Sequence, residues 1–404
     1  MKKTRILASK ISGMSLVPVV VELEQSSEGD KSIIAHNLES IGFNMFSGML
    51  TPESVDLLED LPFVKRIYLD TPKAIPELPL HVGETVQTML SRIRSRFKEK
   101  VDKYTSTFET RTMVGADVAN RKGVLGNVTV GVVDSDSGIA VETHAQLRWR
   151  AKTYDAKPGW SGATNGHGTH VSTITGGGSV RVGDAICMGM APASNLIVVK
   201  SLLTPMGVGM DSDIIKGLSV CVNKGARVIN MSLGSKPEGP PEEDPICQAI
   251  MKLPKNVIVC VASGNDGENR VGSPAYAPNA LAINALDPTT GEKADFSNYG
   301  PESAFIMPGV NILSGTAPGS LLDVATKGYP SYAILSGTSQ ATPHATGVIA
   351  LMVEYFDRLG YTLTVDDIRK MGQYYGEPHT DKRGYGLLKW EYAEKYAKEI
   401  GLVH

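Results

Sequence analysis

The sequence predicts an α/β protein with a mostly parallel sheet covered by helices on both faces, preceded by a small α+β unit. Two observations lead to this prediction. From about Gly123 onward, apolar runs rich in valine and isoleucine alternate with helical patterns, which is typical of parallel strands buried on both faces. Residues 16–70 instead hold short strands and helices of their own. The expected strands of the large sheet are residues 128–133, 196–199, 228–231, 257–261 and 281–285.

The N-terminal unit has the order β-α-β-α-β, which suits a ferredoxin-like sandwich. Its second helix has a clear start, because Thr51 can cap a helix and Pro52 is tolerated at the first helical position. The expected strands are residues 17–21, 42–46, 47–50 and 64–70, and the expected helices are residues 32–40 and a helix from residue 52.

A proline-rich linker follows this unit, because Pro72, Pro76 and Pro79 interrupt the regular pattern. In residues 86–101, apolar residues recur at intervals of three and four, with arginines and lysines on or near the polar face. This pattern predicts a basic amphipathic helix. Such a helix can bind a membrane or a partner, or it can dock on its own protein with a solvated polar face. The near-neutral charge of the chain favours the second interpretation.

Composition argues against several classes of protein. The 404 residues are 42% hydrophobic and 21% charged, which is ordinary for a globular protein with one large core and a smaller domain. A formal net charge of −3 argues against a nucleic-acid binder or an anionic-lipid binder. Charged residues interrupt the apolar run at the N-terminus, so neither a secretory signal nor a membrane span is expected.

The cysteines favour a reducing, cytoplasmic location, with export by another route as the alternative. The chain has four of them, without CxxC or metal-type spacing, so we expect buried reduced thiols rather than disulfides. They are Cys187, Cys221, Cys247 and Cys260.

Ser339 precedes a helical run of small and apolar residues that tolerates Pro343 in its first turn. Unsatisfied N–H groups at a helix start can face an anion, so a nucleophile at this position has half of an oxyanion site. Asp134 ends the expected strand at residues 128–133, where it is either a helix cap or an acid at the carboxyl edge of the sheet.

Two further segments carry polar residues at the start of an expected helix or after an expected strand. His167 and His170 open another helical run and could be metal ligands, but no Cys, Asp or Glu lies near enough in sequence to complete a site. A base and a structural histidine are the better interpretation. Asn265 follows the strand at residues 257–261, within an Asn-Asp-Gly sequence that also makes good turns.

Taken together, these segments resemble the subtilisin-like serine protease family. The motifs His-Gly-Thr-His-Val, Ala-Ser-Gly-Asn-Asp and Gly-Thr-Ser-Gln-Ala-Thr-Pro-His follow the strand-end aspartate in the order of the family. The similarity extends over residues 113–393 and implies a subtilisin-like three-layer αβα fold. It implies these roles: catalytic aspartate Asp134, catalytic histidine His167, oxyanion asparagine Asn265 and nucleophile Ser339.

The resemblance implies a serine endopeptidase acting on peptide or protein substrates. An extended peptide would pair with strands on both of its sides, which is a sequence-tolerant mode of binding. A glycine on the floor of the main specificity pocket would leave room for a large apolar or aromatic side chain. The substrate-binding residues implied are Ser232, Leu233, Gly234, Gly207, Val208, Gly209 and Gly272.

The N-terminal unit is similar to the inhibitory propeptide of this family. The similarity rests on Gly42-Phe43, Ser47-Gly48 and residues 64–70. It implies a self-processing proenzyme whose own propeptide is an intramolecular inhibitor. The expected organisation is a propeptide-like domain at residues 1–80, a linker with the basic helix at 81–112 and a catalytic domain at 113–404.

Three departures from the family's pattern stand out. Asp136 occupies a position where the family usually has glycine; its carboxylate could raise the pKa of His167 or favour basic substrates, but we expect it to point into solvent. Gln340 replaces the usual methionine after the nucleophile, so sulfoxide formation there cannot inactivate the enzyme. Gln146 and the glycine-rich residues 176–179 stand at the family's strong calcium site and provide few hard oxygen ligands.

No cofactor is therefore required by the sequence, no metal ligands are assigned, and the usual calcium site is expected to be absent. The acidic residues Glu242, Glu243 and Asp244 could hold a cation, although a solvated loop is the simpler expectation. Two alternative functions remain. The first is a catalytically silent binding or scaffolding protein that keeps its prodomain. The second is a lipase or esterase, which lacks support because no convincing GxSxG with partners in the required order is present.

Overall fold

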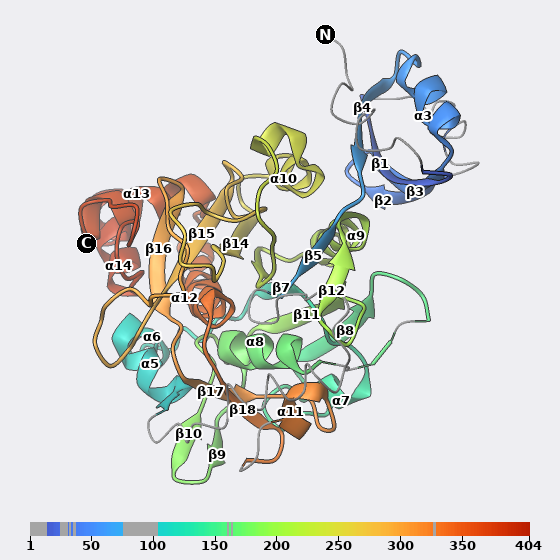
Figure 1. Cartoon of the computed structure of the whole chain (residues 1–404). Helices are drawn as coiled ribbons and strands as arrows, with labels where there is room; N and C mark the ends of the chain where they lie inside the picture. Colours follow the sequence, from blue (N-terminus) through green and yellow to red (C-terminus); the bar gives the residue numbers. More distant parts are fainter. Residues whose placement is uncertain are drawn as a thin grey trace.

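The computed structural model describes residues 14–24, 31, 34, 38–75, 104–159, 161–162, 165–325 and 329–404. These residues form a large α/β body and a small N-terminal unit on one side of it (Figure 1). The strand β5 (Pro72–Ala74) leads from the N-terminal unit into the body (Figure 1).

The N-terminal unit is a four-stranded antiparallel sheet with the order β2-β3-β1-β4. Helix α3 (Pro52–Glu59) begins as predicted, because the Thr51 hydroxyl accepts a hydrogen bond from the backbone N–H of Ser54 at 3.3 Å. Side chains of successive residues point to opposite faces of a strand. Val19 therefore packs in the unit's own core, whereas Val20 packs against the body. The strands are β1 (Val17–Leu23), β2 (Glu39–Gly42), β3 (Met45–Leu50) and β4 (Val64–Leu69).

The expected strand at residues 42–46 is wrong. Phe43 and Asn44 each have a φ of 56° and form the two-residue turn between β2 and β3. Positive φ at both central residues lets such a turn follow the twist of its strands. Gly42 lies so close to helix α9 (Asp211–Asn223) that a Cβ there would come within 2.4 Å of the Ser219 hydroxyl. The hairpin turn thus packs against the body.

Two other expectations concern parts of the chain that are not described. Most of the helix expected at residues 32–40 lies outside the described residues. The basic amphipathic helix of residues 86–101 lies wholly outside them. After the gap, the chain continues with the short strand β6 (Thr105–Ser106) and the helices α5 (Thr107–Val114) and α6 (Ala116–Arg121).

The body is built on a seven-stranded sheet with the order β16-β15-β14-β13-β7-β11-β8, in which every neighbouring pair is parallel. The five predicted strands are confirmed and form the centre of this sheet. The two edge strands were not predicted from the sequence. The strands are β7 (Thr129–Asp134), β8 (Ala151–Asp155), β11 (Asn195–Lys200), β13 (Val228–Met231), β14 (Ile258–Ala262), β15 (Ala280–Leu286) and β16 (Ser303–Pro308).

Helices cover both faces of this sheet, so the predicted three-layer fold is confirmed (Figure 1). Along β7, Val132 packs toward α12 (Thr338–Arg358), and its neighbour Val133 packs toward α9. The first face is also covered by α8 (His167–Gly176), α13 (Val365–Tyr375) and α14 (Glu391–Glu399), and the second by α10 (Pro245–Met251).

The body also contains several short helices and strands outside the seven-stranded sheet. They are α7 (Ile139–Glu142), the 3-10 helix η1 (Pro241–Glu243), α11 (Leu321–Ala325), the hairpin of β9 (Val180–Val182) and β10 (Ala185–Cys187), and the strands β12 (Val208–Met210), β17 (Ile312–Gly315) and β18 (Tyr332–Leu335).

The small residues of α12 allow a close approach to α8. A Cβ added at Gly347 would lie 2.5 Å from the Met190 Cβ and 2.8 Å from the Thr175 carbonyl oxygen of α8. The two helices that carry His167 and Ser339 are therefore packed together without space for a larger residue.

The four cysteines are buried and free, as predicted. Among the helices that the structure describes, none combines the length and the apolar character needed to cross a bilayer.

Candidate active site

Polar side chains meet at the carboxyl edge of the sheet, where β7, β13 and β14 end. Asp134 is the last residue of β7, and Ser232 follows the end of the neighbouring strand β13. Asn265 follows β14, the next strand along the same edge. In parallel sheets this edge is where ligands bind, and the predicted site residues Asp134 and Asn265 lie there.

His167 is the first residue of α8 and contacts the end of β7. Its Nδ1 lies 2.8 Å from Oδ1 of Asp134, and both side chains are buried. Because an ionised carboxylate can only accept, Nδ1 carries the proton and Nε2 is the basic nitrogen of the ring. The backbone N–H of Ser135 donates to the same Asp134 oxygen at 2.8 Å. The aspartate thus fixes the orientation and the tautomer of the imidazole.

Asp136 is buried, so the expectation that it points into solvent is wrong. Its Oδ1 accepts from the N–H of Gly166 at 3.0 Å, and its Oδ2 accepts from the N–H and the hydroxyl of Thr169 at 2.8 and 2.9 Å. Burial raises its pKa, although these donors act in the opposite direction. A carboxylate at a helix start satisfies N–H groups that have no partner within the helix. Asp136 therefore holds the residues on both sides of His167.

Gly168 explains how the strand and the helix come so close. A Cβ at this position would lie 3.0 Å from the backbone nitrogen of Asp136 and 3.2 Å from the Cβ of Asp134. A larger residue in the first turn of α8 would push the histidine away from its aspartate.

Ser339, in the first turn of α12, is tied to the end of β13. Its hydroxyl donates to the Ser232 carbonyl at 3.3 Å, and the Ser232 hydroxyl donates to the Ser339 carbonyl at 2.9 Å. Asn230 continues this network, because its amide donates to the Ser232 hydroxyl at 2.9 Å and its oxygen accepts from Thr346 at 3.1 Å. Since β13 and β7 are neighbours in the sheet, Ser339 and His167 lie over adjacent strand ends.

Asn265 is oriented by the residue before the serine. Its Oδ1 accepts two hydrogen bonds from Thr338, one from the backbone N–H at 2.9 Å and one from the hydroxyl at 2.8 Å. The N–H of Gly264 donates in turn to the Thr338 hydroxyl at 3.3 Å. With its oxygen committed to Thr338, the side chain turns its amide NH₂ group away from that residue.

The predicted substrate-binding residues lie on the two sides of β5. On one side, Ala74 and Gly234 exchange backbone hydrogen bonds of 3.1 and 2.9 Å; on the other side, β5 pairs with β12 in antiparallel fashion. Ile75 donates to the Gly207 carbonyl at 3.1 Å, and a Cβ at Gly207 would collide with the Ile75 side chain. A strand of the N-terminal unit therefore fills the groove between Gly207, Val208 and Gly209 on one side and Gly234, which Ser232 and Leu233 precede in the chain, on the other.

Gly272 lies beside this groove. Its N–H donates to the Ser263 carbonyl at 2.8 Å, and a Cβ there would lie 3.1 Å from the Ser235 carbonyl oxygen and 3.2 Å from that of Ser263. Two backbone segments thus pass close to this glycine, so a side chain on residue 272 itself would crowd them.

The sequence interpretation missed three contributors to the site. Thr338 and Asp136 orient the residues on which catalysis would depend, and Lys73 of β5 enters a buried acidic pocket. The capping role of Asp136 has no local signal, because the donors that it accepts from, Gly166 and Thr169, lie 30 and 33 residues further along the chain. No local signal identifies the partners of Lys73.

Asp244 corrects another expectation. It belongs to the acidic segment that we expected to be a solvated loop, and this holds for Glu242 and Glu243, which are exposed. Asp244 instead is buried and caps α10, with Oδ1 accepting from the N–H groups of Ile246 and Cys247 at 2.9 and 3.0 Å.

Amide hydrogen bonds link Gln146 with the glycine-rich segment that follows α8. The Gln146 side chain donates to the Gly178 carbonyl at 2.8 Å, and the Gly178 N–H donates to the Gln146 carbonyl at 2.8 Å. Across the described parts of the chain, no group of three or more His, Cys, Asp or Glu residues is arranged to hold a metal ion.

Comparison with known proteins identifies relatives of this arrangement. The M-protease of Shouchella clausii is 32% identical over 320 residues, which cover 79% of this chain and 71% of that protein. The alkaline elastase YaB of Bacillus sp. (strain YaB) is 37% identical over 346 residues, covering 83% and 78%. The structure of the prenylagaramide maturation protease PagA matches with a TM-score of 0.57 and 26% identity, over 70% of this chain and 98% of that chain.

The family model of the subtilases matches residues 126–372. This range spans more than half of the chain and includes the strand-end aspartate, the start of α8, the asparagine after β14 and the start of α12. The relatives are named as proteases, and the range matched by the family model holds the buried Asp134–His167 pair and Ser339. The chain therefore belongs to the subtilase family of serine peptidases.

Proposed function

We propose that this subtilase is an endopeptidase in which Ser339 is the nucleophile, His167 the general base and Asp134 the residue that orients the histidine. The observation that carries the proposal is the buried Nδ1 to Oδ1 contact of 2.8 Å between His167 and Asp134. It leaves Nε2 to accept a proton while the neighbouring carboxylate stabilises the imidazolium that forms.

In the first step, the Ser339 oxygen attacks the carbonyl carbon of a peptide bond and His167 takes the hydroxyl proton. The tetrahedral intermediate collapses when the carbon–nitrogen bond breaks and His167 gives its proton to the leaving amine. The resulting acyl ester is hydrolysed by water, with His167 again acting as the base. Ser339 is restored, and the two peptide fragments leave.

The negative charge of the intermediate needs donors that are already in position. We assign this role to the amide NH₂ group of Asn265 and the backbone N–H of Ser339. Thr338 supports the assignment, because it accounts for the Asn265 oxygen with two hydrogen bonds and so fixes which end of the amide can donate elsewhere. The N–H of Ser339 belongs to a helix start, where such groups lack a helical partner.

Substrate would bind as an extended strand between residues 207–209 and residues 232–234. The hydrogen bonds of Ala74 to Gly234 and of Ile75 to Gly207 provide the pattern, because they use backbone atoms that any peptide has. In this scheme Gly272 forms the floor of the main specificity pocket and accommodates a large apolar or aromatic side chain.

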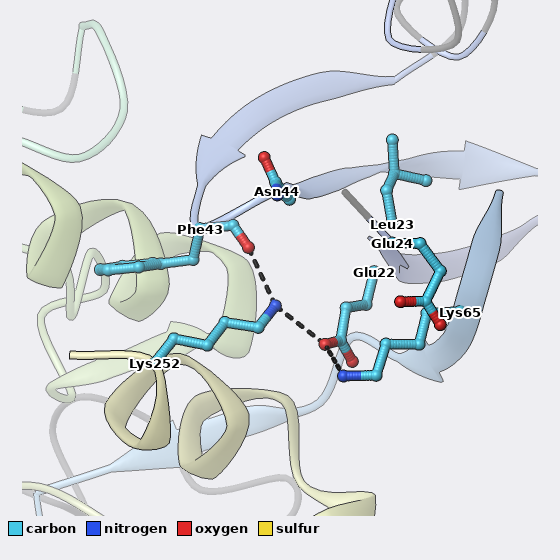
Figure 2. A pocket seen from close by; sticks show the side chains of 7 residues that line it. All are labelled: Glu22, Leu23, Glu24, Phe43, Asn44, Lys65 and Lys252. Carbon is cyan, nitrogen blue, oxygen red and sulfur yellow. Dashed lines mark hydrogen bonds and ion pairs between the residues drawn. The ribbon is translucent and has the colours of Figure 1, made fainter. Parts of the chain in front are cut away.

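The N-terminal unit would then act as an intramolecular inhibitor, which the proenzyme removes by processing itself. Its attachment to the body supports this role. Glu22 of β1 is buried where the unit meets α10, and both Lys65 of β4 and Lys252 of the body place Nζ 2.8 Å from its Oε1 (Figure 2). Lys252 also donates to the Phe43 carbonyl at 2.9 Å (Figure 2). Burial alone would raise the pKa of Glu22, but its hydrogen-bond donors lower it, so the carboxylate stays charged.

We further propose that activity needs neither a cofactor nor the strong calcium site of the family. The proposal rests on Gln146, which stands where the family usually has an aspartate and whose amide donates to the Gly178 carbonyl.

The test compares the purified protein with its Ser339→Ala variant. We expect the wild type to shorten its own chain and to cleave an unstructured protein, whereas the variant does neither. If the two proteins behave alike, the endopeptidase proposal is wrong, and a scaffolding protein that retains its N-terminal unit becomes the better account.

A further inference from the structure

Lys73 of β5 directs its side chain out of the groove and into the body. Its ammonium lies 2.9 Å from Oδ1 of Asp211 and 3.9 Å from Oδ2 of Asp244, and it donates to the Thr71 hydroxyl at 3.2 Å. Only 5% of Lys73 is exposed, and Asp211 is wholly buried. Burial alone would lower the pKa of Lys73, but the two carboxylates raise it above its usual value. The ammonium therefore stays charged inside the protein.

The acidic pocket, Asp211 together with Asp244, belongs to the body and not to the N-terminal unit. Asp211 opens α9 directly after β12, which is one wall of the groove. Asp244 divides its oxygens: Oδ1 caps α10, whereas Oδ2 accepts from the Ser273 hydroxyl and faces Lys73. The pocket therefore remains in the enzyme after any removal of the N-terminal unit.

Asp211 makes its side-chain bonds to the strand in the groove. Within the described residues, the donors to its carboxylate are Lys73 and Thr71, the latter through its N–H at 3.1 Å and its hydroxyl at 2.7 Å. Two buried carboxylates that face one point repel each other, so keeping both ionised is unfavourable without a cation between them. The geometry thus suits a positively charged side chain that arrives on a bound strand.

The register fixes which residue of a bound strand would supply that charge. Ala74 pairs with Gly234 in antiparallel orientation. In a substrate bound in the same register, the residue two positions after the one paired with Gly234 would stand opposite Ser232. The Ser232 carbonyl is 3.3 Å from the Ser339 hydroxyl. In a peptide bound in this register, the residue that takes the place of Lys73 comes three residues before the one that lies nearest the nucleophile.

We propose that the acidic pocket is a specificity subsite that selects a lysine side chain three residues before the substrate residue opposite Ser232. This inference rests on the proposed endopeptidase function and adds the class of substrate: extended peptides with a basic residue at that position. Lys73 then occupies in the proenzyme the place that the substrate lysine takes in the active enzyme.

The test uses the full chain after its own processing and three fluorogenic peptides that differ only at this position. One carries lysine, one the neutral near-isostere norleucine and one glutamate. We expect kcat/KM for the lysine peptide to exceed that for norleucine by about tenfold or more, with glutamate the poorest, because a polar site left without its partner discriminates strongly. In Asp211→Asn the ratio of lysine to norleucine falls toward one. The matched control Glu243→Gln, at an exposed acid beside the pocket, keeps the wild-type ratio.

The outcomes are distinguishable. Equal cleavage of the lysine and norleucine peptides by the wild type overturns the subsite while leaving the endopeptidase in place. This comparison needs no variant, so it stands even if Asp211→Asn fails to fold. Absence of cleavage of all three peptides and of an unstructured protein overturns the proposed function, and the subsite with it. A peptide with arginine at the same position shows whether the pocket accepts the larger guanidinium.

Discussion

Thr338 donates both its backbone N–H and its hydroxyl to a single atom, Oδ1 of Asn265. The residue before the proposed nucleophile thus fixes the proposed oxyanion donor, and it links the start of α12 with the end of β14. These two hydrogen bonds join the motif that contains Asn265 to the motif that contains Ser339.

Thr338→Val tests this link, because valine keeps the shape and the backbone bond but removes the hydroxyl. We expect kcat to fall about tenfold with little change in KM, less than the loss of about 10²–10³ that removal of a whole oxyanion donor causes in subtilisin. Thr338→Ser, which keeps the hydroxyl, is the matched control and retains most of kcat. Steady-state kinetics on one peptide decides the matter: a valine variant with wild-type kcat would remove Thr338 from the mechanism.

Asp136→Asn tests the support beneath His167. An amide NH₂ group must replace one carboxylate oxygen, so it faces either the N–H of Gly166 or the donors of Thr169. We expect a loss of about 1–3 kcal/mol in the free energy of unfolding, which is typical of a buried polar group that loses its partner. Urea unfolding in the Ser339→Ala background avoids self-digestion.

The same substitution also loosens the first turn of α8, so kcat falls in the otherwise wild-type enzyme. Asp184→Asn, at an exposed turn, is the control and changes neither quantity. If Asp136→Asn unfolds at the wild-type urea concentration, the carboxylate does not hold the helix start.

Gln340 predicts that the activity of the enzyme resists oxidation. It is buried beside Ser339 and has no sulfur to oxidise. We expect the wild type to keep its activity in mild peroxide, whereas Gln340→Met loses activity as its thioether becomes a sulfoxide. Activity against time in peroxide measures this, and mass spectrometry of the peptide with residue 340 identifies the modified atom. Rapid loss in the wild type traced to chemistry beside Ser339 would contradict the prediction.

The sequence predicted the centre of the fold better than its edges. The strand at Val228–Met231 is buried on both faces and apolar except for Asn230, and it was predicted correctly. Ala151–Asp155 instead is polar and partly exposed, so nothing in its composition separated it from a loop. The turn at Phe43 and Asn44 was missed because apolar residues on both sides suggested a continuous strand.

The site shows the same division. Residues within motifs, such as His167 and Ser339, could be found from the sequence because their neighbours are characteristic. The surroundings of Asp136 could not, since its exposure depends on how closely α8 approaches β7. The pairing of Lys73 with Asp211 depends on two segments far apart in the chain that meet only when β5 enters the groove.

The acidic pocket predicts a pH-dependent preference. Burial raises the pKa of Asp211 to about 6, assisted by Asp244 and opposed by Lys73. This value holds with Lys73 in the pocket, whose place a substrate lysine takes in the active enzyme. With a lysine bound, the charge of Asp211 is therefore present above about pH 6 and is lost as the pH falls through that value. The titratable groups near the pocket are Lys73 and Asp70 from the N-terminal strands, Asp213 from α9, Asp244 and Cys247 from η1 and α10, and Tyr276.

Cys247 and Tyr276 stay neutral near pH 6, because burial raises the pKa of each. We therefore expect the ratio of kcat/KM for the lysine peptide to that for the norleucine peptide to be high at about pH 8 and to decline toward one by about pH 5. The ratio cancels the titration of the catalytic groups, which both substrates share. In Asp211→Asn the ratio should be low at every pH, since no carboxylate remains at position 211 to lose its charge. A wild-type ratio that stays high at about pH 5 would contradict the prediction, and a high ratio in Asp211→Asn as well would assign the selection to Asp244.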